Sequence, residues 1–139
     1  MRDRPIIFNS FMVKAIKLGK KTQTRWVSGA KYNKGDVLWI RETHFISDNN
    51  NIFYKADYNK TKNLKWRSSI YMKKEHSRIN LKVESVRYEP LQSISKEDSI
   101  KEGFSNIEEF KELWDNLNKD NNKWDSNPNV YVVTFEVIE

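Results

Sequence analysis

Residues 18–25 read Leu18-Gly19-Lys20-Lys21-Thr22-Gln23-Thr24-Arg25 and follow a short amphipathic segment. Glycine adopts positive φ readily, so Gly19 is expected to end a helix and to present the following cations from a turn. If the chain then winds into a helical or 3₁₀ turn, Lys21 and Thr24 lie at i and i+3 and face the same way. An amine beside a hydroxyl, with the Arg25 guanidinium nearby, can bind an anion or activate a nucleophile. A basic, solvated loop is the alternative interpretation.

Composition indicates a soluble, folded chain without thiol chemistry. The 139 residues are 37% hydrophobic and 13% aromatic, with a mean hydropathy of −0.84. This length predicts a single domain over residues 1–139. Because no apolar run approaches the length of a membrane span and the first residues lack the apolar core of a signal peptide, a cytoplasmic protein is expected. The chain has no Cys and only two His, His44 and His76, so neither a metal site nor a cofactor is expected.

Charge is distributed unevenly along the sequence. Residues 1–82 hold 19 Lys+Arg against 6 Asp+Glu, a balance of +13, whereas residues 83–139 hold 6 against 13, a balance of −7. Together they give the net charge of +6. The asymmetry indicates a basic face that could attract phosphate, with an acidic region elsewhere. A lysine-rich composition that serves only solubility is the alternative.

Hydrophobic periodicity predicts short strands interspersed with helices. The expected strands are residues 5–8, 37–40, 52–54, 79–90 and 130–138, and the expected helices begin near Asn9 or Ser10, at Ser95 and at Ser105. The last helix begins with a capping box, Ser105 with Glu108, and reaches about residue 118. Residues 26–33 and 57–65 are predicted to be loops. A chain that begins and ends in a strand, with helices between, predicts an α+β fold: a small β-barrel with two to three helices at its mouth.

Two further groups of side chains are candidates for ligand binding. Arg41 and Glu42 follow a predicted core strand directly, and residues at a strand end are held rigidly. Trp66 and Arg67 lie side by side, and an aromatic ring beside a guanidinium can stack a base and bind a phosphate. Ordinary ion pairs, and side chains that pin a loop, are the alternatives.

Several motifs in order resemble the ASCH domain family, most closely its longer, phage- and prophage-encoded members. The motifs that carry the resemblance cover nearly the whole chain: Arg4-Pro5-Ile6-Ile7-Phe8, Gly19-Lys20-Lys21-Thr22-Gln23-Thr24-Arg25, Gly35-Asp36-Val37-Leu38-Trp39-Ile40-Arg41-Glu42-Thr43, Trp66-Arg67-Ser68-Ser69-Ile70-Tyr71-Met72, Ser77-Arg78-Ile79, Glu102-Gly103-Phe104 and Trp124-Asp125-Ser126-Asn127-Pro128. The resemblance implies a PUA-like β-barrel with a cleft suited to RNA or a modified nucleoside.

One group within that family resembles small amidohydrolases that deacetylate 4-acetylcytidine. Their motif Gly-x-Lys-x-x-Thr and a later Glu fall on Lys21, Thr24 and Glu102, which the resemblance therefore implies as catalytic residues. Relative to those enzymes the chain has added sequence between residues 47 and 67, which could cover or reshape a pocket.

The chemistry sets a condition on this assignment. A free Lys titrates near ~10.4, so Lys21 as the base for a Thr24 nucleophile would need its pKa lowered by roughly 3 units, or about 4 kcal/mol. Nearby cations such as Arg25 favour that shift, whereas contact with Glu102 opposes it. A neutral amine and a charged Lys21–Glu102 pair exclude each other in the resting protein.

Three functions therefore remain open from the sequence. The first is hydrolysis of an N-acyl amide on a nucleobase. The second is non-catalytic binding of RNA or a modified nucleoside, with stacking on Trp66 and phosphate contacts from the basic side chains Lys20, Lys21, Arg25, Arg41, Arg67 and Arg78. Single-strand ribonuclease activity, which the resemblance to the family implies, is the third, and the same charged cleft is consistent with it.

Overall fold

The computed structural model describes residues 2–27, 32–58 and 64–138. Residues 28–31 and 59–63, in the predicted loops 26–33 and 57–65, lie outside the described residues.

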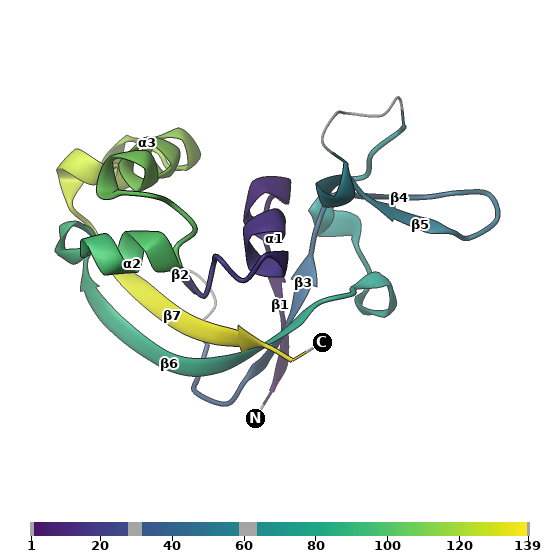
Figure 1. The fold of residues 1–139 in the computed structure, drawn as a ribbon, viewed down its shortest axis with the longest axis horizontal. Coiled ribbons are helices and arrows are strands. Elements are labelled where there is room, and N and C mark those ends of the chain that lie inside the picture. Colours follow the sequence, from purple (N-terminus) through teal and green to yellow (C-terminus); the bar gives the residue numbers. More distant parts are fainter. Residues whose placement is uncertain (1, 28–31, 59–63, 139) are drawn as a thin grey trace.

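A strongly curved sheet of five strands forms the framework (Figure 1). Its order is β1-β3-β6-β7-β2, with β1 at Asp3–Ile7, β3 at Val37–Arg41, β6 at Asn80–Pro90, β7 at Asn129–Val137 and β2 at Gln23–Trp26. The pair β1–β3 is parallel and the other neighbours are antiparallel. A separate two-stranded hairpin joins β4, His44–Ile46, to β5, Ile52–Tyr54. The α+β class is confirmed, and in the described sheet β1 and β2 are the two edge strands of an open, barrel-like curve.

One helix covers the concave side of the sheet. Helix α1 spans Ser10–Lys17, and the Asn9 side chain accepts a hydrogen bond from the Met12 backbone N–H at its start. Its apolar face packs into a core with residues of β1, β3, β6 and β7. The helix ends before Gly19, whose φ of +75° lies in the left-handed region, as its sequence predicts.

Two helices cover the opposite face of β7. Helix α2 spans Lys96–Lys101 and α3 spans Ile107–Leu117. Because neighbouring side chains of a strand alternate between faces, Val130 and Val132 meet Phe110 and Trp114 of α3 on one side of β7, while Val133 and Phe135 join the core under α1. The N-cap of α3 lies one residue later than predicted. Asn106, not Ser105, accepts a hydrogen bond from the backbone N–H of the third helical residue, Glu109.

Among the described residues, six short 3₁₀ turns connect these elements. They span Lys55–Asp57, Ser69–Tyr71, Lys74–His76, Leu91–Ser93, Asp120–Asn122 and Trp124–Ser126.

The stretch after Gly19 differs from its predicted conformation. Instead of a helical or 3₁₀ turn, Gln23–Trp26 forms β2 and pairs with β7, so that Thr24 lies opposite Val133 and Trp26 opposite Tyr131. The prediction failed because a strand of polar residues has no hydrophobic alternation that would reveal it. As a strand, it places Thr24 and Trp26 on one face and Gln23 and Arg25 on the other.

A β-bulge sets which residues of β6 face the core. The register with β7 shifts between Val83 and Ser85, so that Glu84 is the additional residue. On the amino-terminal side of the bulge Leu81 and Val83 face the core, and beyond it Val86 does.

Gly103, which follows the carboxyl end of α2, is expected to be the more costly of two glycines to replace. Its φ is +105°, and an added Cβ would lie 3.3 Å from the Ala15 Cβ and 3.6 Å from the Lys21 Cβ. Gly19 has φ +75° with no atom within 4 Å of such a Cβ. We expect both Gly→Ala variants to lose about 1 kcal/mol from backbone strain, and G103A to lose about 1–3 kcal/mol more from overpacking. Urea denaturation of the two variants measures the difference, and equal midpoints would contradict this account.

Candidate functional site

Lys21 is a buried ammonium whose three N–H groups all have acceptors. Its side chain is 1% exposed, and Nζ lies 2.8 Å from the backbone oxygen of Gln23, 3.2 Å from that of Glu102 and 3.0 Å from Glu102 Oε1. A lysine has three donors, so none remains unused. The sequence left open either a neutral Lys21 amine or a charged Lys21–Glu102 pair, and these contacts are those of the ion pair.

Glu102 bridges two buried cations. Its second carboxylate oxygen accepts from Arg25 Nη1 at 2.7 Å, while Oε1 accepts from Lys21. Arg25 also pairs with Asp98 at 3.2 Å and Glu89 at 3.6 Å, and donates to the side-chain oxygen of Gln23. The Lys21–Glu102–Arg25 cluster thus joins β2 to the carboxyl end of α2, and its charges are paired within the protein.

Asp98 extends this cluster toward solvent. Burial raises the pKa of Asp98, but the charges of Arg25 and Arg87 outweigh that effect and leave the pKa below its ordinary value. The carboxylate therefore favours the folded state while it is ionised.

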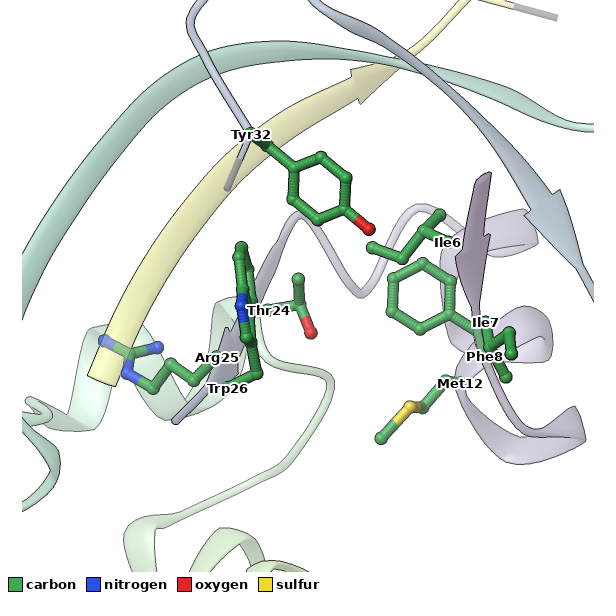
Figure 2. Close-up of a pocket in the computed structure, with 8 residues that line it drawn as sticks. All are labelled: Ile6, Ile7, Phe8, Met12, Thr24, Arg25, Trp26 and Tyr32. Carbon is green, nitrogen blue, oxygen red and sulfur yellow. The ribbon is translucent and has the colours of Figure 1, made fainter. Parts of the chain in front are cut away.

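A cavity of about 310 Å³ opens between the two edge strands of the sheet. Figure 2 shows the Thr24 hydroxyl pointing into it, between the Trp26 and Tyr32 rings on one side and Phe8 and Met12 on the other. Within the described part of the chain nothing hydrogen-bonds to this hydroxyl, whereas the Tyr32 hydroxyl donates to the Pro5 backbone oxygen at 2.9 Å. We call this space the β1–β2 cavity.

A second cavity, of about 190 Å³, lies on the α3 side of β2. It shares Met12, Thr24, Arg25 and Trp26 with the β1–β2 cavity and includes Glu102 in its wall. The rest of its lining is mostly apolar and comes from Phe104, Phe110, Leu113, Trp114 and Leu117. Thr24 and Glu102 therefore face a common space, although they come from distant parts of the chain.

Glu42 and Arg78, both candidates from the sequence, form a different cluster. Arg78 donates two hydrogen bonds to Glu42, at 3.0 and 3.1 Å, and two to Asp57, at 2.8 and 2.9 Å, and its guanidinium lies 4.0 Å from the centre of the Tyr54 ring. Glu42 is buried, which raises its pKa against the opposing effect of Arg78. These bonds engage all three guanidinium nitrogens of Arg78. Neither Glu42 nor Arg78 lines the two cavities.

The other candidates also line neither of the two cavities. Arg41 donates from Nε to the Met72 backbone oxygen at 3.1 Å, and Lys20 is exposed. The backbone of Arg67 pairs with that of His44, and Trp66 packs against Tyr58, with ring centroids 6.0 Å apart. The structure thus pairs Lys21 and Arg25 with Glu102. Thr24 shares a cavity wall with Arg25 and Glu102. The remaining candidates take part neither in these ion pairs nor in the two cavities: Lys20, Arg41, Glu42, Trp66, Arg67 and Arg78.

Sequence reasoning missed the aromatic wall of the β1–β2 cavity. Trp26 and Tyr32 both fall in the segment predicted to be a loop. The signal was the spacing Thr24-x-Trp26, which places both side chains on one face if the segment is a strand.

Neither metal nor membrane features occur in the described residues. They contain no group of three or more His, Cys, Asp or Glu side chains that could hold a metal ion. They also contain no helix with the length and hydropathy needed to cross a bilayer.

No family model and no curated protein matches the sequence, but solved structures match the fold. The crystal structure of hypothetical protein PH0355 aligns with a TM-score of 0.61 and 14% identity over 99% of this chain and 100% of that one. The ASCH domain from Lactobacillus crispatus JV V101 aligns with a TM-score of 0.56 and 9% identity, covering 98% of this chain and 79% of that one. Protein EF3133 from Enterococcus faecalis V583 gives a TM-score of 0.56 and 12% identity, covering 99% and 80%.

These matches define the class of the molecule as a small α+β domain built on a curved sheet. More particularly, the chain has an ASCH-like fold, as its sequence motifs predicted. At identities of 14% and below, the likeness concerns the fold.

Removal of the negative charge from the buried cluster should destabilise the protein strongly. In Glu102→Gln two buried cations lose their shared anion, and breaking a buried ion pair in this way costs about 3–5 kcal/mol. Glu97→Gln, at an exposed position of α2, is the matched control and should change stability by less than about 0.5 kcal/mol. Urea denaturation compares the two, and similar midpoints would show that the cluster does not hold β2 to α2.

Asp98 should contribute a pH-dependent part of the stability. Because its folded-state pKa is depressed, its contribution is present above the unfolded pKa of about 3.9 and is lost as the pH falls through the folded value. We therefore expect Asp98→Asn to be less stable at neutral pH and to lose less stability on acidification than the unaltered protein. Asp125→Asn, at an exposed position, is the control. Melting temperatures measured across the acid range test this, and parallel curves for D98N and the unaltered protein would contradict it.

Proposed function

We propose that the β1–β2 cavity binds one unstacked nucleobase, presented by a modified nucleoside or by single-stranded RNA. The observation that carries the proposal is that one cavity combines two aromatic rings, Trp26 and Tyr32, with the Thr24 hydroxyl, which has no hydrogen-bond partner among the described residues (Figure 2). A volume of about 310 Å³ lies in the range of small-molecule sites. Base recognition by proteins commonly combines stacking on aromatic rings with hydrogen bonds to base edges.

The charge of the chain supports an anionic or nucleotide ligand. Residues 1–82, which supply β1, β2 and every lining residue of the β1–β2 cavity, carry a balance of +13. Arg25, which lines the cavity, and Lys21 are buried and are both paired with Glu102. Contacts to phosphate would therefore come from exposed side chains such as Lys20 rather than from this cluster.

Hydrolysis of an N-acyl group on the bound base is a second candidate function. It is favoured by the position of the Thr24 hydroxyl, which shares a cavity with Glu102 while Glu102 contacts Lys21. Because the three N–H groups of Lys21 are all donated to acceptors, this side chain could act as a base only after a proton passes from Nζ to Glu102 Oε1, 3.0 Å away. Neutral Lys21 would then take the proton of Thr24 as its oxygen bonds to the acyl carbon. Protonated Glu102 would return its proton to the amine that leaves as the C–N bond breaks, and water would release the acyl group from Thr24.

Binding can be separated from hydrolysis in one set of measurements. We expect cytidine and 4-acetylcytidine to quench tryptophan fluorescence, and Trp26→Leu to weaken binding by about 5- to 100-fold, because stacking on an aromatic ring is worth ~1–3 kcal/mol per base. Trp39→Leu, at a half-buried tryptophan of β3 outside both cavities, is the control and should bind as the unaltered protein does.

The acetylated ligand also reports on chemistry. Mass spectrometry should detect cytidine formed from 4-acetylcytidine, and Thr24→Val should abolish that product while binding persists. Binding without any product would leave base recognition as the function and would remove the hydrolytic candidate. If neither ligand binds, or if W26L and W39L bind equally, the proposal for the β1–β2 cavity is wrong.

A further inference from the structure

Beyond the β1–β2 cavity, aromatic rings continue across the sheet in an unbroken row. Tyr32 contacts Trp26 with ring centroids 5.2 Å apart, Trp26 contacts Tyr131 at 5.8 Å, and Tyr131 contacts Tyr88 at 4.7 Å. The last three are cross-strand neighbours on β2, β7 and β6, so they share one face of the sheet. Tyr88, at the far end, is 58% exposed.

A third cavity accompanies this row. It has a volume of about 430 Å³ and is bounded by Tyr32, Lys34, Glu84, Val86 and Tyr131, among others. Tyr32 lines both this cavity and the β1–β2 cavity, so the two spaces share this residue. The hydrogen bond from the Tyr32 hydroxyl to the Pro5 backbone oxygen fixes that ring in place.

The polar groups of the third cavity suit a ribonucleotide. Lys34 is exposed, and within the described residues no carboxylate pairs with it, so its ammonium can contact a phosphate. The Glu84 carboxylate, in the same wall, can accept a hydrogen bond from a ribose 2′-hydroxyl. Exposed rings beside such groups are the usual platform for single-stranded nucleic acid.

We propose that the cavity between Tyr32 and Tyr131 holds the nucleotide adjacent to the one in the β1–β2 cavity, and that Tyr88 stacks a further base. The inference rests on the proposed function and narrows it: the natural ligand is single-stranded RNA rather than a free nucleoside. A cross-strand aromatic row that only stabilises the ribbon would give the same packing. It would not, however, make affinity depend on the length of the ligand.

The test compares a short oligocytidylate RNA with cytidine. We expect the RNA to bind at least about tenfold more tightly, since each stacked base adds ~1–3 kcal/mol. Tyr88→Leu should remove most of that gain and leave the affinity for cytidine unchanged. Tyr71→Leu is the matched control, because Tyr71 is also exposed, at 67%, but belongs to a 3₁₀ turn away from the row.

Salt dependence gives a second measurement that does not rely on stacking. The dependence of log K on log salt concentration for the RNA should become shallower by about 0.7 in Lys34→Ala, as expected for loss of one phosphate contact on a single strand. Lys73→Ala, at another exposed lysine, should leave the slope unchanged.

The outcomes distinguish this inference from the function on which it rests. Equal affinity for RNA and cytidine would overturn the adjacent-nucleotide site and leave base binding in the β1–β2 cavity intact. The same conclusion would follow if Y88L and K34A both still bound the RNA more tightly than cytidine by the full factor. Absence of binding by either ligand would overturn both.

Discussion

The carboxylate of Glu102, held between Lys21 and Arg25, is the contact on which the arrangement of the site depends. Removing ions from water is costly, and here the three charged groups offset that cost with hydrogen bonds to one another and to backbone oxygens. Through them an edge strand of polar composition is held against the end of α2. The backbone N–H of Thr22, which donates to the Lys101 oxygen at 2.7 Å, adds a second link between the same segments.

The same contact shapes what the neighbouring cavity can recognise. Since Glu102 pairs with both Lys21 and Arg25, the cavity presents aromatic rings and the Thr24 hydroxyl beside a guanidinium whose charge is already paired. In the proposed function, such a surface would discriminate ligands by shape and by a few hydrogen bonds, and exposed lysines would attract the phosphate. Different residues would then recognise the base and the nucleic-acid backbone.

Local patterns in the sequence predicted much of the framework. Strands β1, β3 and β7, and α1 with its Asn9 cap, follow from hydrophobic runs and from capping and glycine signals. The β2 strand was missed because Gln23–Trp26 is held by pairing with β7 and by buried charges, not by an apolar face. Lys21 and Glu102 are separated by 81 positions, so spacing could not join them, and only the resemblance to a family did. Conversely, Arg78 looked available for phosphate, but its partners Glu42 and Asp57 became evident only in three dimensions.

Glu84, the additional residue of the β6 bulge, determines more than the local bend of its strand. Were the alternation of Leu81 and Val83 to continue unbroken, Ser85 and Arg87 would face the core, and Val86 and Tyr88 would face away from it. Because Glu84 is an additional residue, Val86 instead faces the core, on the same side as Leu81 and Val83. Across related chains, therefore, the length of this strand should be restricted, because loss of position 84 would exchange the two faces of the outer half of the strand.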